Sequence, residues 1–295
     1  MIYSVKPDVI VNAAAYTAVD KAESEPELAH AINAAAPAVL AQATLDMGCK
    51  LIHYSTDYVF DGSGRAPWTE DSPTAPLNIY GKTKLAGEQA ISASGCQHLI
   101  FRTSWLYAKK GSNFAKTMLR LACERDALSV IDDQIGAPTD AAWLADVTAQ
   151  VIVAMEQTPL CTQSQTPLSA RADISPTSQG QTNTSDLNLV CPYAIGEMSQ
   201  SDKGVGCSGI FHATSSGEVS WHGYASYLIA RARELGFPIK VKPEAISAVA
   251  SEAFPLPAKR PHNSRLDCSK LTATFGITPP PWQQGIDQLL EHLKP

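Results

Sequence analysis

The stretch Val9-Ile-Val-Asn-Ala-Ala-Ala15 begins with apolar, β-branched residues and ends in small ones. A run of this kind is typical of a buried strand in a parallel sheet. Farther along the chain, residues 25–47 have a helical pattern that begins near Pro26 and stops at Gly48, and Leu51-Ile-His-Tyr-Ser55 is a second apolar run. The order strand, helix, strand predicts parallel pairing through a crossover connection.

The same alternation continues downstream. We expect helices over residues 79–93 and 114–124, a strand over residues 98–105, and a further helix over 140–155 that Asp140 caps. Strands that alternate with helices at this spacing predict a doubly wound parallel α/β sheet for residues 1–157.

The composition changes sharply at residue 158. Residues 158–207 contain 20 Ser, Thr, Gln or Asn and only six charged residues. Such a segment does not bury enough apolar surface to offset the entropy of ordering, so we expect a low-complexity, mostly disordered surface insertion; a structured accessory lobe is the alternative. Residues 208–295 are expected to form mainly a smaller substrate-binding lobe, with a strand near 209–214, a helix at 219–235 and two closing helices.

The overall composition excludes some classes of protein. The chain has 295 residues and a net charge of −6. Nucleic-acid-binding domains usually have an excess of basic residues, so this charge argues against a nucleic-acid-binding protein. Its seven cysteines are scattered without a Cys-x-x-Cys pair, which is typical of reduced thiols. Neither a secretory signal pattern nor a run of ~18 apolar residues is present, so we expect a cytoplasmic protein without a membrane span.

One glycine motif invites a wrong assignment. Gly204-Val-Gly-Cys-Ser-Gly209 satisfies the G-x-G-x-x-G pattern of dinucleotide-binding turns. That pattern works only between a strand and a helix N-terminus, which faces the pyrophosphate. Here a low-complexity segment precedes the glycines and a strand is expected after them, so we reject the motif as a cofactor loop.

Tyr80 and Lys84 are the strongest candidates for chemistry. Residues four apart on a helix project from the same face, so the two side chains share one space. A phenol near pKa 10 is a weak acid at neutral pH, and a nearby ammonium brings it closer to its working range. Thr56 ends the second predicted strand, where ligands of such sheets bind. Most Tyr-x-x-x-Lys spacings are a half-buried tyrosine and a solvated lysine; the position after Ser55-Thr-Asp57 favours a proton-donating site instead.

Several segments together resemble the dTDP-4-dehydrorhamnose reductase family of extended short-chain dehydrogenases. They are residues 11–25, Ser55-Thr-Asp-Tyr-Val-Phe-Asp-Gly62, residues 76–88, Phe101-Arg-Thr-Ser-Trp-Leu-Tyr107, residues 134–139 and Arg260-Pro-His-Asn-Ser-Arg265. The resemblance covers nearly the whole chain outside residues 158–207. It implies a Rossmann-like fold, NADPH or NADH as cofactor, and reduction of the C4 ketone of dTDP-4-dehydro-L-rhamnose to give dTDP-L-rhamnose.

The resemblance also assigns roles to the catalytic candidates. It implies that Tyr80 protonates the C4 oxygen, that Lys84 lowers the tyrosine pKa and holds the cofactor ribose, and that Thr56 assists the tyrosine. Thr56 and Asp57 would contact the sugar, against which Trp105 would pack.

The cofactor and the diphosphate have further candidates. The resemblance implies that the cofactor contacts Tyr80 and Lys84 and is lined by residues after the first strand, namely Ala14, Ala15, Tyr16 and Thr17. Tyr16 stands in place of the family's usual histidine. Trp105 on an apolar strand is equally a core aromatic by its residue type alone. Arg260 and Arg265 are candidate diphosphate contacts because guanidinium groups match phosphate oxygens, and solvated loop charges are the alternative.

Two departures from the family pattern bear on function. The family has a strand, a Gly-rich turn and a helix before the segment that begins here, so we expect residues 1–157 to be an incomplete, N-terminally truncated dinucleotide-binding domain with an open sheet edge at the Val9 strand. Some members also form a magnesium-bridged dimer through glutamates, but this chain has Ala141-Ala-Trp143 at one such place and only Glu291 near the C-terminus. We expect no metal, and a monomer or weak homodimer.

A second function of a different class stays open. A chain without its Gly-rich turn would serve as a non-catalytic nucleotide-sugar-binding or NADP-binding regulatory subunit, or would be an inactive homologue. The retention of Thr56, Tyr80 and Lys84 favours the reductase, because a binding protein has no need of a tuned phenol.

Overall fold

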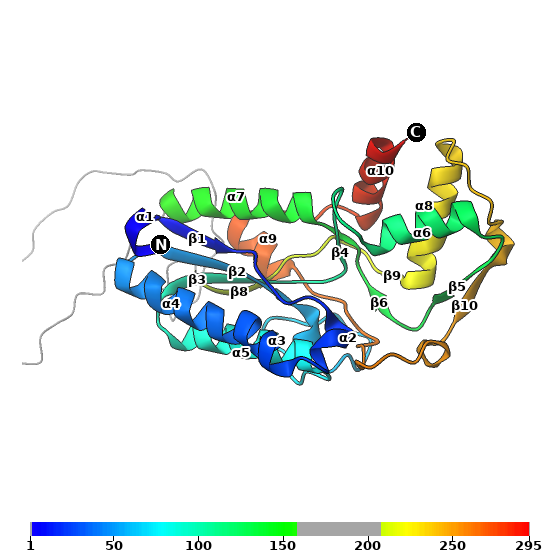
Figure 1. Ribbon diagram of the computed structural model, residues 1–295. Coiled ribbons are helices and arrows are strands. Elements are labelled where there is room, and N and C mark those ends of the chain that lie inside the picture. The colour runs from blue at the N-terminus through cyan, green and yellow to red at the C-terminus, as the bar shows by residue number, and fades with distance from the viewer. Residues whose placement is uncertain (1, 158–207, 295) are drawn as a thin grey trace, which may run out of the picture. The chain divides into compact units, whose positions relative to one another are not determined.

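A parallel sheet forms the centre of the protein. The computed structural model describes residues 2–157 and 208–294, so the predicted insertion at 158–207 lies outside the described residues. The strands run in the order β1 (Val9–Asn12), β2 (Lys50–Thr56), β3 (Gln97–Thr103) and β8 (Gly209–His212), and all three pairings are parallel. The sheet and the helices on its two faces (Figure 1) confirm the α/β fold class.

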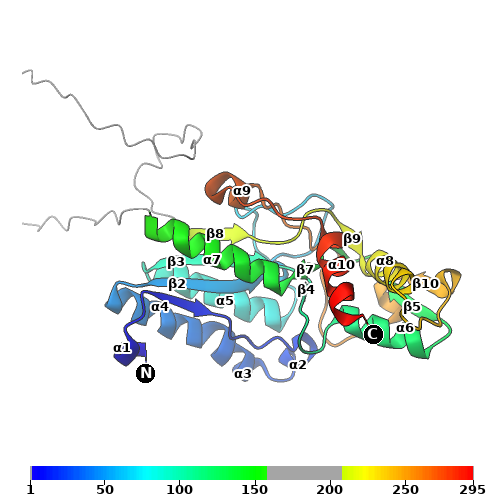
Figure 2. The same cartoon turned by 90° about the horizontal axis from the view of Figure 1, so that it is seen from above.

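The alternation of side chains along β2 and β3 explains how helices cover both faces. Leu51 and Ile100 point to one face, where they pack with Ala41 of α4 (Ala36–Met47) and Ile91 of α5 (Ile79–Ala93). Their neighbours point to the other face, against α7 (Ala141–Gln157) and α9 (Ser269–Phe275). Figure 2 shows these two helices on the side of the sheet opposite α4 and α5. Since β8 completes the sheet, the sheet draws strands from both sides of residues 158–207.

The helix expected over residues 25–47 is interrupted. It consists of α3 (Pro26–His30), a π-helical turn η1 (Ala31–Ala35), and α4. Pro37 has no N–H and would clash with the carbonyl four residues earlier, that of Asn33, so a regular α-helix cannot continue through this point. The carbonyl of Asn33 instead lies against Gly87 of α5, where an added Cβ would be only 2.2 Å from the oxygen.

The segment Pro26–Met47 is long and apolar enough to cross a membrane by length and composition alone. In this fold it lies along the sheet, and the fully buried Ala41 contacts the same core as Leu51 of β2. The described structure therefore gives these residues the role of a core-covering helix.

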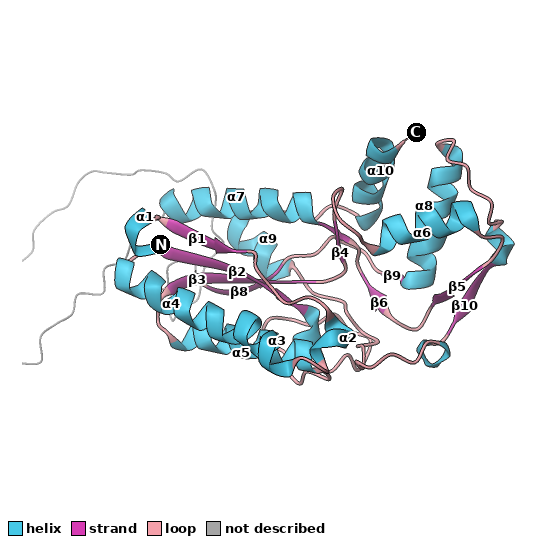
Figure 3. Cartoon of the chain, in the orientation of Figure 1, coloured by secondary structure: helices cyan, strands magenta, loops and turns pink. Residues whose placement is uncertain are grey.

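A second group of helices and strands forms the remainder of the described chain. Here α6 (Phe114–Glu124), α8 (Trp221–Glu234) and α10 (Trp282–Leu293) share an apolar cluster, and β5 (Leu128–Ile131) pairs in parallel with β10 (Ile246–Val249). The remaining short elements are α1 (Ile2–Val5), α2 (Val19–Ala22), η2 (Asp57–Val59), β4 (Leu106–Tyr107), β6 (Ile135–Gly136), β7 (Thr139–Asp140), β9 (Val219–Ser220), η3 (Pro243–Ala245) and η4 (Ser251–Ala253). Figure 3 shows the elements of the second group next to the short strands β4, β6 and β9.

The predicted boundaries are confirmed best where a capping residue is visible in the sequence. The helices predicted at 79–93 and 114–124 have those bounds, and the Asp140 carboxylate accepts a hydrogen bond from the N–H of Ala142 at 3.0 Å. The helix predicted from residue 219 begins at Trp221 instead, because Ser220 caps it. The strand that follows the rejected glycine motif is present as β8.

Candidate active site

The predicted catalytic residues meet at the carboxyl end of β2. Thr56 is the last residue of β2, Tyr80 lies in the first turn of α5, and Lys84 follows one turn later. The Asn78 side chain caps α5 by accepting a hydrogen bond from Gly81 N at 2.8 Å. A Cβ on Gly81 would be 2.2 Å from the Tyr58 carbonyl oxygen, so glycine lets the start of α5 lie directly against the segment after β2.

The phenol of Tyr80 is partly buried and protonated at neutral pH. Burial raises its pKa to about 12, and the Thr56 hydroxyl opposes this shift. The ring of Tyr58 lies edge-on at 5.6 Å between centroids. At neutral pH the Tyr80 phenol therefore keeps the proton that the predicted proton-donating role requires.

Lys84 is buried, with 2% of its surface exposed, and its amine is held from β2. Nζ donates to the Tyr54 carbonyl oxygen at 2.6 Å and lies 3.1 Å from His53 Nε2. Burial lowers the pKa of Lys84 to about 8, which Glu88 opposes. The lowering of the Tyr80 pKa by this lysine stays a prediction: burial raises that pKa, and the amine is held by Tyr54 and His53.

Asp57 is a buried carboxyl group beside the same site. Its Oδ1 accepts a hydrogen bond from the Thr56 hydroxyl at 3.1 Å, and burial raises its pKa to about 6 against the opposing effects of Ser264 and Thr56. Within the described residues, four buried side-chain oxygens at the carboxyl ends of β2 and β3 have no hydrogen-bond partner: Ser55 Oγ, Asp57 Oδ2, Thr103 Oγ1 and Ser104 Oγ. These unpaired oxygens are gathered at the strand ends where ligands of parallel sheets bind.

The loop predicted to line the cofactor lies next to Lys84. Ala14, Ala15 and Thr17 are exposed, while Tyr16 is partly buried. The Asn33 side chain accepts from Tyr16 N at 2.8 Å, and its Nδ2 donates to Tyr16 O at 3.0 Å and Thr83 Oγ1 at 3.2 Å. This bridge fixes the loop beside the turn of α5 that carries Lys84.

Tyr16, which replaces the family's usual histidine, is itself anchored. Its hydroxyl donates to Glu25 Oε2 at 2.6 Å, and this bond is the largest cause that raises the tyrosine pKa to about 12. The phenol therefore points into a polar contact within the loop and does not ionise at neutral pH.

Trp105 is strained and stacked. Its backbone has φ of 50°, and its ring lies on that of Trp221 with centroids 3.6 Å apart and planes 11° apart. Gly136 leaves room for the ring, because a Cβ there would be 2.7 Å from it. Trp105 was predicted to be either a core aromatic or a contact of the sugar. Both tryptophans pack against a core cluster but are only partly buried, so part of the stack stays exposed.

The candidate phosphate-binding arginines are both paired with carboxylates. Arg260 binds Asp20 through two bonds, at 2.7 Å and 3.1 Å. Arg265 donates to Glu218 at 2.5 Å and to Asn263 Oδ1 at 3.1 Å. Their roles as diphosphate contacts stay a prediction.

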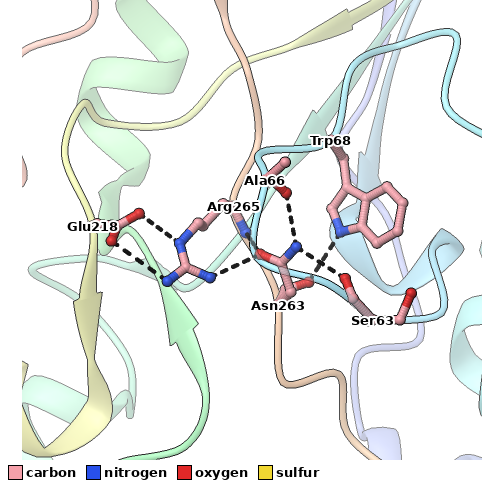
Figure 4. Close-up of polar contacts among 6 residues, drawn as sticks. All are labelled: Ser63, Ala66, Trp68, Glu218, Asn263 and Arg265. Carbon is pink, nitrogen blue, oxygen red and sulfur yellow. Dashed lines mark hydrogen bonds and ion pairs between the residues drawn. The ribbon is translucent and has the colours of Figure 1, made fainter.

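Figure 4 shows how Asn263 joins the Arg265 segment to the loop after β2. The side-chain amide of Asn263 donates to the backbone carbonyl oxygens of Ala66 at 2.9 Å and Ser63 at 3.2 Å. The backbone carbonyl of Asn263 accepts a hydrogen bond from Trp68 Nε1 at 3.1 Å. This clamp holds Ser264 in reach of Asp57.

Four residues of the site were not identified from the sequence. His53 contacts both Asn12 and Lys84, Asn33 holds the loop predicted to line the cofactor, and Asp20 pairs with Arg260. Of these four, only His53 could have been predicted from the sequence. It lies two residues after Leu51 on the same strand, so both side chains point to the face of the sheet that α5 covers.

The fold and the site define the class of the protein as a Rossmann-like α/β protein with the residues of a Tyr–Lys reductase. The chain matches the family described as the RmlD substrate binding domain over residues 1–166 and 174–294. It is 45% identical over 293 residues to dTDP-4-dehydrorhamnose reductase of Escherichia coli K12, covering 99% of this chain and 82% of that protein. The identity to the Burkholderia thailandensis reductase is 39%, over 97% of this chain and 82% of that protein.

Solved structures are similar over the same length. A Bacillus anthracis dTDP-4-dehydrorhamnose reductase in complex with NADP has a TM-score of 0.76 at 30% identity, covering 99% of this chain and 83% of that one. The Clostridium acetobutylicum reductase has the same TM-score at 32% identity, covering 100% of this chain and 84% of that one. The chain belongs to the dTDP-4-dehydrorhamnose reductase family.

Proposed function

We propose that this chain reduces the C4 ketone of dTDP-4-dehydro-L-rhamnose to give dTDP-L-rhamnose, with NADPH as the cofactor. The convergence of Thr56, Asp57, Tyr80 and Lys84 at the carboxyl edge of β2 carries the proposal, together with membership in the family. The NADP complex of the B. anthracis relative supports the choice of cofactor.

The described residues fit the nicotinamide-ribose end of that cofactor. Small, exposed side chains of the loop at Ala14 and Ala15 lie beside the turn with Lys84, through the Asn33 bridge. Lys84 would hold the ribose hydroxyls with its amine. When bound, NADPH supplies the hydride that reaches C4 of the sugar.

The chain's own residues supply the proton and the orientation. Tyr80 gives its phenolic proton to the C4 oxygen, so that the ketone gains one hydride and one proton and becomes an alcohol. Thr56 would turn its single hydroxyl proton from Asp57 Oδ1 to the substrate carbonyl or to the tyrosine oxygen, and so orient that group. Asp57 and the unpaired oxygens near it would accept hydrogen bonds from sugar hydroxyls.

A coupled assay on this chain tests the proposal. We expect oxidation of NADPH only when dTDP-4-dehydro-L-rhamnose is present, and dTDP-L-rhamnose as the product by mass spectrometry. Titration with NADPH, followed by fluorescence, is the control that separates catalysis from binding. Binding without turnover would favour the regulatory subunit, and no turnover under any cofactor would refute the reductase. NADH in place of NADPH settles the cofactor preference.

We also propose a cytoplasmic monomer or weak homodimer that acts on the nucleotide sugar without nucleic acid, a membrane or a resident metal. Within residues 2–157 and 208–294, no group of three or more His, Cys, Asp or Glu side chains is placed to hold a metal ion. We expect the elution volume in size-exclusion chromatography to be the same in magnesium and in EDTA. A dimer that forms only with magnesium would contradict this.

A further inference from the structure

A buried polar chain runs behind the proposed site from β1 through β2 to α5. Asn12 and His53 are register partners in the sheet, and Asn12 Nδ2 lies 3.0 Å from His53 Nδ1. The other ring nitrogen, Nε2, lies 3.1 Å from Lys84 Nζ. The three residues are 8%, 0% and 2% exposed. The proposed reaction assigns no role to Asn12 or His53.

The hydrogen bonds fix the orientation of the Asn12 amide. The backbone N–H of Ala14 donates to Asn12 Oδ1 at 3.2 Å, and an N–H requires an acceptor. The NH₂ group of Asn12 therefore faces His53. Because an amide nitrogen only donates, His53 Nδ1 is the acceptor of this contact and has no proton.

The remaining proton of His53 must then lie on Nε2. Burial, the largest cause, lowers the pKa of this imidazole to about 3, so the ring is neutral and has one N–H. That N–H points at Lys84 Nζ, which also donates to the Tyr54 carbonyl oxygen at 2.6 Å. An ammonium has three donors and no acceptor, so every contact in the chain is satisfied only when Nζ is an uncharged amine.

A protonated Lys84 requires the opposite arrangement. His53 Nε2 must then accept, the ring proton must move to Nδ1, and Asn12 must turn its oxygen toward the ring. This rotation of the Asn12 side chain breaks the hydrogen bond from the N–H of Ala14, which lies in the loop predicted to line the cofactor. Burial lowers the pKa of Lys84 to about 8, so both arrangements are accessible near neutral pH.

The other ionisable groups around Lys84 do not take the place of His53 as the partner of its amine. Glu88, one turn later on α5, raises the pKa of Lys84 against the effect of burial, and its carboxylate is bound by Arg102 of β3 at 2.6 Å. Tyr80, one turn earlier, stays protonated. From β1 the facing group is the uncharged Asn12.

We propose that Asn12 and His53 are positioning residues for Lys84, and that the tautomer of His53 changes when Lys84 gains or loses its proton, which couples the lysine charge to the Ala14 amide. This inference rests on the proposed function, because its consequence for catalysis requires that Lys84 and the loop at Ala14 face the same cofactor.

Nitrogen NMR of the full chain tests the coupling without any assay of activity. In uniformly ¹³C,¹⁵N-labelled protein titrated from pH 6 to 10, we expect the His53 ring proton to move from Nδ1 to Nε2, with no imidazolium. The Ala14 amide should shift with the same midpoint as Lys84. One tautomer at every pH, or an imidazolium form, would overturn the proposal.

Two variants sharpen the test. In Lys84→Met the tautomer should stay Nε2–H at every pH, and a persisting switch would refute the coupling. In Asn12→Asp the carboxylate only accepts, so the Nδ1–H tautomer is held and the Lys84 midpoint should rise by about 1 pH unit; an unchanged tautomer or midpoint overturns the proposal. Failure of the reductase assay with a normal switch would refute only the proposed function, and turnover with a fixed tautomer would refute only the coupling.

Discussion

Replacing Tyr80 by Phe is expected to lower kcat by about 10²–10⁴-fold while the affinity for the nucleotide sugar changes little. The substitution removes one oxygen and keeps the ring, so the edge contact with Tyr58 survives. The Tyr80 phenol has a pKa of about 12 and is therefore protonated at pH 7. Without this phenolic oxygen, the substrate carbonyl has no proton donor. Steady-state NADPH oxidation and calorimetric titration with a non-reacting dTDP-sugar measure the two quantities.

Tyr54→Phe is the matched control for this variant. Tyr54 lies on β2 near the same site, but its hydroxyl bonds Thr148 of α7 at 2.7 Å, on the opposite face of the sheet. We expect its kcat to stay within about 3-fold of the wild type, because a hydrogen bond lost there costs stability of about 1 kcal/mol and no proton donor. Equal losses in the two variants would show that Tyr80 acts through the fold. Undiminished turnover in Tyr80→Phe would refute the mechanism.

The sequence predicted those parts of the site that lie within one helical turn or one strand. Thr56, Tyr80 and Lys84 were identified from the end of a strand and an i, i+4 spacing, and the helix that carries two of them has its predicted bounds. Local signals of this kind, such as the cap at Asp140, are visible along the chain because the partner is only two residues away.

Contacts between distant segments were beyond such reasoning. Asp20 and Arg260 are 240 residues apart, and nothing local marks either as the partner of the other. The predicted lowering of the Tyr80 pKa by Lys84 rests on a shared helix face, and the spacing does not show that Tyr54 and His53 hold the lysine amine. The π-helical turn near Pro37 was missed for a related reason: the proline removes one bond, and the close approach of Gly87 determines how the helix adjusts.

The ion pair between Glu88 and Arg102 sets the largest expected effect on stability. The two side chains are 2% and 3% exposed, and the guanidinium donates to both carboxylate oxygens at 2.6–3.2 Å. The arginine also lies 5.1 Å from the Phe60 ring centroid. Removing one partner of such a pair leaves a charge that is buried without compensation.

We therefore expect Glu88→Ala to lower the free energy of unfolding by about 3–5 kcal/mol, measured by urea denaturation. Glu124→Ala is the matched control: Glu124 also pairs with an arginine, Arg120 at 2.8 Å, but both side chains are more than half exposed, so its loss should cost about 0.5 kcal/mol or less. The double variant Glu88→Leu with Arg102→Met, which removes both charges, should recover much of the loss. If Glu88→Ala and Glu124→Ala are equally stable, the Arg102 guanidinium is not desolvated as the structure has it, and the ion pair contributes no more than a surface pair.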